Sequence, residues 1–286
     1  MQASILTTVI MPLSLGIIML GLGLFLSLED FKRVAKYPKA ISIALVCQMI
    51  ILPILCFFLA RAFNMPPELA VGLMLLSASP GGPTANLYSH LSNGDVALNI
   101  TLTAVNSVLT LFTLPFIVNL SMDYFMESGQ YLPMQFRKVI EVFTIVLGPV
   151  LIGMFIKSKA PAFAAKMDKP VKILSALFLA LIIAAITYNE RGTLVNSFKQ
   201  LGGPVLFFNL LSMAVGYYLP QAFRVEKRQA VAIGMEIGLH NGTLAIYIAL
   251  NVIHNSTMAM PPAMYGLLMF FTAAMFGFLV NVGRKK

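Results

Sequence analysis

Long runs of apolar residues separated by short polar segments are the main feature of the chain. Each run is about 20 residues long, the length that an α-helix needs to cross the roughly 30 Å hydrocarbon core of a bilayer. Nine such runs are found, near residues 5–28, 38–62, 69–91, 95–122, 137–157, 170–188, 203–223, 229–252 and 260–283. The pattern predicts an all-α polytopic membrane protein with about nine transmembrane helices.

Composition and charge agree with this prediction. Of the 286 residues, 58% are hydrophobic and 11% are charged, whereas soluble domains carry about 25% charged residues. An ordinary soluble domain is therefore excluded. With the N-terminus outside, most basic residues fall in inside segments, namely Lys32, Arg33, Lys36, Lys39, Lys157, Lys159, Lys166, Lys169, Lys172, Arg224, Lys227, Arg228, Arg284, Lys285 and Lys286.

This distribution of basic residues predicts the orientation of the chain. Cytoplasmic loops carry an excess of Lys and Arg, so we expect a multi-pass membrane protein whose N-terminus is outside and whose C-terminus is in the cytoplasm. The basic residues then need no nucleic acid as partner, and the expected partner is the lipid bilayer, with no obligatory protein partner.

Two of the predicted spans contain sequences that interrupt a helix. The third span contains Pro80-Gly81-Gly82-Pro83, and the eighth contains Leu239-His-Asn-Gly242 directly after Gly238. Proline and glycine both disfavour a continuous helix. At membrane depth, broken backbone persists only where it is buried in protein or lines a wet cavity. We expect both helices to break and the two breaks to cross.

The chain also resembles itself at an offset of 160 residues. Ala62-Phe63 matches Ala222-Phe223, Ala70-Val71 matches Ala230-Val231, and Gly82 matches Gly242. The matched spans are separated by an odd number of helices, which gives the two copies opposite orientations. We predict an inverted repeat, with a first copy of four helices in residues 1–136 and a second of five in 137–286. Inverted repeats with paired broken helices are typical of secondary transporters.

Glu236 lies in the middle of the eighth predicted span. A carboxylate at membrane depth costs about 2.5–3.5 kcal/mol on insertion scales, which makes it a candidate functional residue. We interpret Glu236 as a cation ligand; the alternative is a protonated carboxyl in a structural hydrogen bond.

Several motifs together resemble those of the bile acid:sodium symporter family. They are Gly21-Leu-Gly-Leu24, Glu29-Asp-Phe31, Pro80-Gly-Gly82, Gly94-Asp-Val-Ala-Leu98 and Glu236-Ile-Gly-Leu-His-Asn241. The resemblance implies a bacterial member that lacks the first helix of ten-helix relatives. It implies a core domain with two crossed broken helices and a smaller panel domain, interleaved in sequence.

The resemblance also implies sodium as the coupling ion, with one or two ions bound to each chain. The first position would use Asn86, Asn99, Thr103 and Glu236, with Ala85 where relatives usually have Ser. The second would use Gln48, Glu236, the carbonyls of Ile237 and Leu239, and His240, where relatives have Gln. Hard cations prefer oxygen to imidazole nitrogen, so the second position is altered. The expected substrate contacts are Gly81, Gly82, Pro83, Thr84 and Asn241.

We therefore predict a secondary transporter and no enzyme, with no catalytic residues. Its expected activity is sodium-coupled symport of an organic anion by alternating access. The anion is bile-acid-like or a small carboxylate such as pantoate. Proton coupling through Glu236 and His240, one helical turn apart, is the main alternative. An intramembrane enzyme or a channel is a weaker one.

Overall fold

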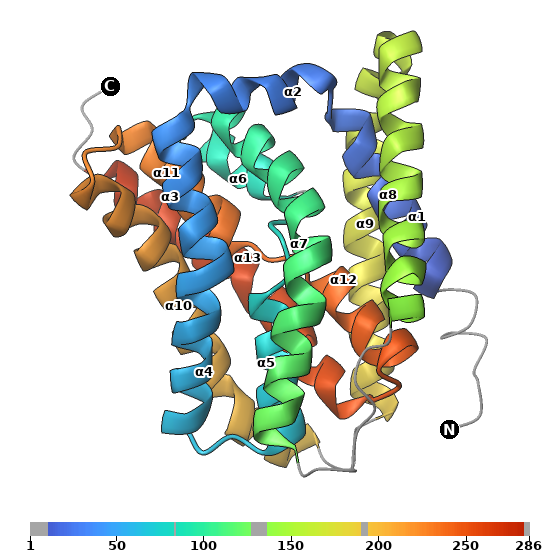
Figure 1. Cartoon of the computed structure of the whole chain (residues 1–286), viewed down its shortest axis with the longest axis vertical. Coiled ribbons are helices and arrows are strands. Elements are labelled where there is room, and N and C mark those ends of the chain that lie inside the picture. The colour runs from blue at the N-terminus through green and yellow to red at the C-terminus, as the bar shows by residue number, and fades with distance from the viewer. Residues whose placement is uncertain (1–10, 83, 127–135, 190–193, 283–286) are drawn as a thin grey trace.

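A computed structural model describes residues 11–82, 84–126, 136–189 and 194–282 (Figure 1). These residues form helices and no β-strand. Five of the described helical segments are long and apolar enough to cross a membrane, and a bent pair of helices makes a sixth. The prediction of an all-helical membrane protein is therefore confirmed. The count of nine spans and the inverted repeat stay predictions.

The helices follow one another with short connections. Their bounds are α1 (Met11–Phe25), α2 (Leu28–Lys32), η2 (Arg33–Lys36), α3 (Pro38–Val46), η3 (Cys47–Ile51), α4 (Leu52–Ala62), α5 (Pro67–Ser77), α6 (Ala85–Leu91), α7 (Val96–Phe125), α8 (Phe136–Lys159), α9 (Pro161–Asn189), α10 (Leu194–Ala222), α11 (Lys227–Gly238), α12 (Gly242–Tyr247), η4 (Ile248–Val252), η5 (Thr257–Ala259) and α13 (Met260–Asn281).

Two groups of helices can be distinguished. Helices α1, α8 and α9 contact one another and stand on one side of the molecule, on the right in Figure 1. We call these three the side bundle and the remaining helices the main bundle. Helix α2 leads from the side bundle to α3 across one end of the molecule (Figure 1). Helices α5, α6, α11 and α12 belong to the main bundle.

The first predicted span, 5–28, differs from the structure at its end. Helix α1 stops at Phe25, and the chain continues as a helix over Leu28–Lys36 at an angle of 70°. Asp30 explains this boundary, because its carboxylate accepts hydrogen bonds from the backbone N–H and the hydroxyl of Ser27, both at 2.7 Å. This N-cap arrangement starts a new helix.

Two helices of the second half contain proline in their interior. Helix α9 begins at Pro161 and runs through Pro170, and α10 begins at Leu194 and runs through Pro204. Both helices therefore begin before the apolar runs at 170–188 and 203–223 that predicted them. Helices in membranes tolerate proline, because neighbouring groups satisfy the freed backbone carbonyl.

A turn recurs at the offset of the sequence repeat. Asn64 after α4 and Arg224 after α10 both have positive φ, at 46° and 59°. The following residues make equivalent bonds, Met65 N–H to Ala60 O at 3.0 Å and Val225 N–H to Pro220 O at 2.9 Å. Helix α5 then starts at Pro67 and α11 at Lys227. The two helix pairs thus share one connection geometry, 160 residues apart.

Candidate functional site

Both predicted helix breaks are present, and they are hydrogen-bonded to each other. The first lies between α5 and α6, and the second between α11 and α12. Gly82 N–H donates to Leu239 O at 2.6 Å, and Asn241 N–H donates to Pro80 O at 2.8 Å. Gly81 and His240 form an isolated antiparallel bridge at this point. The freed backbone groups of one break therefore satisfy those of the other.

The carboxylate of Glu236 lies beside this crossing, in the last turns of α11. Its side chain is fully buried. Oε2 accepts a hydrogen bond from the Thr103 hydroxyl at 2.7 Å, and Oε1 accepts one from the Asn106 amide at 3.3 Å. Both donors lie on α7. Two neutral donors do not cancel the charge of a buried carboxylate, so this position suits a cation or a proton.

Gly81 allows the carboxylate to lie against the broken backbone. A Cβ atom built on Gly81 would overlap both carboxylate oxygens of Glu236 and the carbon between them. At Gly82, the nearest atoms would be the carbonyl oxygens of Leu239 and His240 at 3.3 Å. An added side chain at position 81 would therefore displace the Glu236 carboxylate from its present place, whereas at 82 the new contacts would be tight.

One face of α7 supplies the other polar groups near Glu236. Asn99, Thr103 and Asn106 recur at helical spacing and are fully buried. The Asn99 amide donates to Ala232 O at 2.8 Å, while its Oδ1 has no hydrogen-bond donor within the described chain. Asn106 Oδ1 also lacks a donor there. The sequence analysis missed Asn106, although its position seven residues after Asn99 is a signal for this face.

The unpartnered side-chain oxygens fit a hard cation. Five amide oxygens in this region are buried without a donor in the described chain: Gln48 Oε1, Asn86 Oδ1, Asn99 Oδ1, Asn106 Oδ1 and Asn209 Oδ1. Buried polar atoms normally have a partner, and hard cations take carboxylate, amide and carbonyl oxygens. The residues of the first predicted sodium position, Asn99, Thr103 and Glu236, therefore form a suitable ligand set. Asn86 lies at the start of α6, half-buried.

The residues of the second predicted position are arranged differently. Gln48 and His240 both point their nitrogens at one carbonyl, with Gln48 Nε2 at 2.9 Å and His240 Nδ1 at 3.2 Å from Ser79 O. The Leu239 carbonyl already accepts from Gly82, and Ile237 lies buried in the last turn of α11. No hydrogen bond between Glu236 and His240 is found among the described residues.

The expected substrate residues lie at the crossing, with one exception. Gly81 and Gly82 are buried there, and Thr84 precedes α6 half-buried. Asn241 is 4% exposed, and its Oδ1 caps α12 by accepting from Leu244 N–H at 3.0 Å. Pro83 lies outside the described residues. Asn241 thus has a structural role, and the substrate contacts stay a prediction.

A cavity of about 610 Å³ lies between the two helix groups. Asn86, His90 and Ile100 line it from α6 and α7, and Phe25 and Lys157 line it from α1 and α8. Lys157 Nζ donates a hydrogen bond to the Phe25 carbonyl. Pockets for small organic ligands have about 300–1,000 Å³. A mostly apolar wall with one lysine suits an amphipathic anion.

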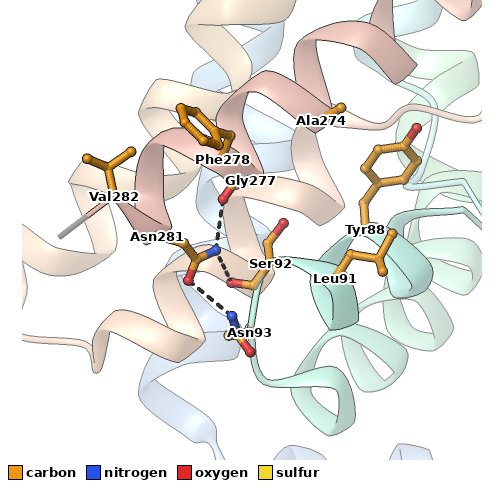
Figure 2. Close-up of a pocket in the computed structure, with 9 residues that line it drawn as sticks. All are labelled: Tyr88, Leu91, Ser92, Asn93, Ala274, Gly277, Phe278, Asn281 and Val282. Atoms are coloured by element: carbon orange, nitrogen blue, oxygen red, sulfur yellow. Dashed lines mark hydrogen bonds between the residues drawn. The ribbon is translucent and has the colours of Figure 1, made fainter. Parts of the chain in front are cut away.

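A second hollow, of about 500 Å³, lies between the end of α6 and the C-terminal part of α13 (Figure 2). Asn281 holds these elements together, donating to Ser92 O at 3.0 Å and to Gly277 O at 2.8 Å. The Asn93 amide donates to Asn281 Oδ1 at 3.2 Å. The first cavity is lined by one residue of the candidate site, Asn86, and this hollow by none.

Comparison with known proteins identifies the family. Residues 3–197 match the model of the sodium bile acid symporter family. The chain is 28% identical over 255 residues to the uncharacterized sodium-dependent transporter YocS of Bacillus subtilis, covering 88% of this chain and 77% of that protein. It is 27% identical over 259 residues to the probable sodium/metabolite cotransporter BASS2 of rice chloroplasts (Oryza sativa subsp. japonica), covering 90% of this chain and 60% of the relative.

A mouse relative, the P3 protein, is 27% identical over 226 residues, covering 78% of this chain and 47% of that protein. The chain therefore spans about half to three quarters of these relatives' lengths. Glu236 lies beyond the residues that match the family model, so its role rests on the geometry described above. The chain belongs to the sodium bile acid symporter family, a family of multi-pass membrane transporters and not of enzymes.

Proposed function

We propose that this protein is a sodium-coupled symporter of an organic anion that works by alternating access. The observation that carries the proposal is the buried Glu236 carboxylate, placed against two crossed helix breaks and beside amide oxygens that lack donors. Such a site needs a cation to balance its charge. The names of the relatives, sodium-dependent transporter and sodium/metabolite cotransporter, support sodium as that cation.

The architecture we propose has nine spans in two inverted repeats, residues 1–136 and 137–286. The recurrent turns at Asn64 and Arg224 and the paired breaks support it. In this proposal the main bundle is the core domain, and the side bundle of α1, α8 and α9 is the panel domain. The basic residues favour an N-terminus outside and a C-terminus in the cytoplasm of a bacterial inner membrane.

The proposed binding site for the substrate is the cavity between the two bundles. Lys157 brings a positive charge to its wall, and the remaining lining is mostly apolar. An anion with an apolar body, such as a bile acid, matches both features. A small carboxylate such as pantoate fits the same charge and leaves part of the volume to water.

Alternating access requires the two bundles to change their contact around the site. Thr103 and Asn106 hold the Glu236 carboxylate at the crossing, and Gly82 and Asn241 hold the two breaks together. When the cation balances the charge of Glu236, the site becomes one neutral, ordered unit. Its exposure can then switch from one side of the membrane to the other at a low cost in free energy. We propose that this neutral unit is the state in which the main and side bundles move relative to each other.

Uptake by proteoliposomes tests the proposal. Purified protein is reconstituted, and uptake of radiolabelled cholate and pantoate is measured with sodium and pH gradients imposed independently and the membrane potential clamped. We expect saturable accumulation that follows the sodium gradient. Uptake that ignores sodium and follows the pH gradient would instead support proton coupling through Glu236 and His240. Flux that does not saturate and needs no gradient would indicate a channel.

A further inference from the structure

We infer that this chain binds one cation, on the α7 side of Glu236, and that His240 closes the second position that the sequence predicts. This inference rests on the proposed sodium-coupled function and adds its stoichiometry. Two groups of polar side chains flank Glu236, one on α7 and one around Ser79, and they differ in the atoms that they leave free to bind a cation.

The α7 side combines a negative charge with oxygens that are free to bind. Both Glu236 oxygens point to this side, because their hydrogen bonds come from Thr103 and Asn106. The amide nitrogens of Asn99 and Asn106 are used as donors, so the amide oxygens are the atoms left over. A carboxylate, a hydroxyl and two amide oxygens are ligands that a hard cation prefers.

The Ser79 side presents nitrogen donors instead. A carbonyl oxygen only accepts, so the hydrogens of both Gln48 Nε2 and His240 Nδ1 point at Ser79 O. The Gly238 carbonyl is taken in the same way, by the Asn209 amide at 3.1 Å and the Tyr265 hydroxyl at 2.8 Å. Side-chain donors here satisfy the carbonyls of Ser79 and Gly238, and the Leu239 carbonyl of the predicted second position accepts from Gly82 N–H at 2.6 Å.

The imidazole is also held in place by aromatic rings. It stacks on Phe208 with ring centroids 5.8 Å apart and an angle of 15°, and it meets the edge of Tyr265 at 5.4 Å. These contacts fill the space beside His240 with carbon. The side-chain oxygens there that lack a donor among the described residues are two neutral amides, Gln48 Oε1 and Asn209 Oδ1, and the imidazole adds no oxygen to them.

The inference is tested by measuring the binding of ²²Na⁺ to the purified full chain, which requires no transport. Choline replaces sodium so that the ionic strength stays constant. We expect one ion per chain and a Hill coefficient of about 1, since one site cannot bind cooperatively. Two ions per chain would overturn this inference and leave the proposed function intact. Absence of sodium binding would overturn both.

Matched variants locate the ion. Asn106→Ala removes an amide oxygen on the α7 side and should weaken sodium binding about tenfold, as expected for a hydrogen-bonding group facing a charge. Asn209→Ala removes an amide of the same type on the other side of the crossing and should leave the affinity unchanged. The reverse order of effects would place the ion on the Ser79 side and contradict the inference.

His240→Gln tests why the second position is closed. Glutamine brings an amide oxygen in place of the imidazole, so the stoichiometry should rise from one ion towards two. His240→Phe is the control, because it keeps a ring between Phe208 and Tyr265 and adds no oxygen; it should stay at one. A His240→Gln protein that elutes as a folded monodisperse sample and still binds one ion would show that His240 does not close the position.

Discussion

Gly81 lies in the first helix break, directly against the carboxylate of Glu236. Its missing side chain leaves the space that the Glu236 carboxylate fills. Any larger residue must displace either the carboxylate or the crossing, and both belong to the candidate site. We therefore propose that this glycine serves the candidate site, in addition to its role in breaking the helix.

We expect Gly81→Ala to weaken sodium binding on the order of 100-fold, because the carboxylate must move out of reach of Thr103 and Asn106. Gly82→Ala should have a smaller effect, since its Cβ would meet carbonyl oxygens at 3.3 Å. Gly148→Ala on α8 is the control, with no atom within 4 Å of the added carbon. Equal affinities in the three variants would show that Gly81 is not needed for the site.

Asn86→Ala and Thr103→Ala should each raise the sodium concentration for half-maximal uptake by about three- to tenfold, because each removes one oxygen ligand. Asp95→Asn is the comparison. Asp95 Oδ1 caps α7 through Leu98 N–H at 3.0 Å, and asparagine keeps that cap. The measurement is uptake against sodium concentration. Unchanged sodium dependence in both alanine variants would remove Asn86 and Thr103 from the site.

The sequence was sufficient to predict the residues whose chemistry conflicts with a membrane. Glu236 and the Pro80-Gly-Gly82 break could be found because a charge and a broken helix are both costly in an apolar span. The surroundings of His240 could not be predicted, because Phe208 and Tyr265 come from α10 and α13. Such contacts depend on tertiary packing and leave no local signal.

Among the helices, the boundary set by capping was the least predictable. The bend after Phe25 depends on the Ser27–Asp30 cap, which is a short signal inside a long apolar pattern. The crossing of the two breaks was predictable, because each break frees backbone groups that need a partner. The structure provides that partner through the Gly82 and Asn241 amides.

The contact between α6 and α13 provides a test of stability separate from binding. Asn281→Ala removes its bonds to Ser92 O and Gly277 O (Figure 2) and should destabilise the protein by about 1–2 kcal/mol. Sodium affinity should not change, since the hollow contains no site residue. Thermal unfolding in detergent measures the effect.

Asn93→Gly is the control for that variant. It keeps the positive φ of 56° at this position and loses one exposed bond, so its effect should be smaller. If Asn281→Ala changed sodium affinity while leaving stability unaltered, the separation between this contact and the candidate site would be wrong.

On the scale of the whole molecule, the cavity between the main and side bundles borders both the proposed cation site and the proposed anion route. Asn86 borders the cavity and contributes one of the unpartnered oxygens. Lys157 faces the cavity from the other bundle. A negative charge at Glu236 and a positive charge at Lys157 thus lie on separate bundles, which suits a carrier that binds a cation and an anion together.

Lys157→Gln should raise the KM for an anionic substrate by about tenfold and leave maximal uptake less affected, because the lysine attracts the anion and takes no part in the cation site. Lys159→Gln is the control, two residues further along α8 and exposed. Initial rates of cholate uptake at saturating sodium measure both. A KM that rises equally in the two variants would indicate a general surface-charge effect.

The most direct test of the central claim is gradient-driven uptake by Glu236→Ala beside wild type in the same proteoliposome preparation. The variant should insert and fold, because it removes a buried charge, and a matching gel-filtration profile checks this. Its sodium-driven uptake should fall by on the order of 100-fold or more, since the charged ligand of the cation site is gone. A folded Glu236→Ala protein with undiminished sodium-driven uptake would contradict the account.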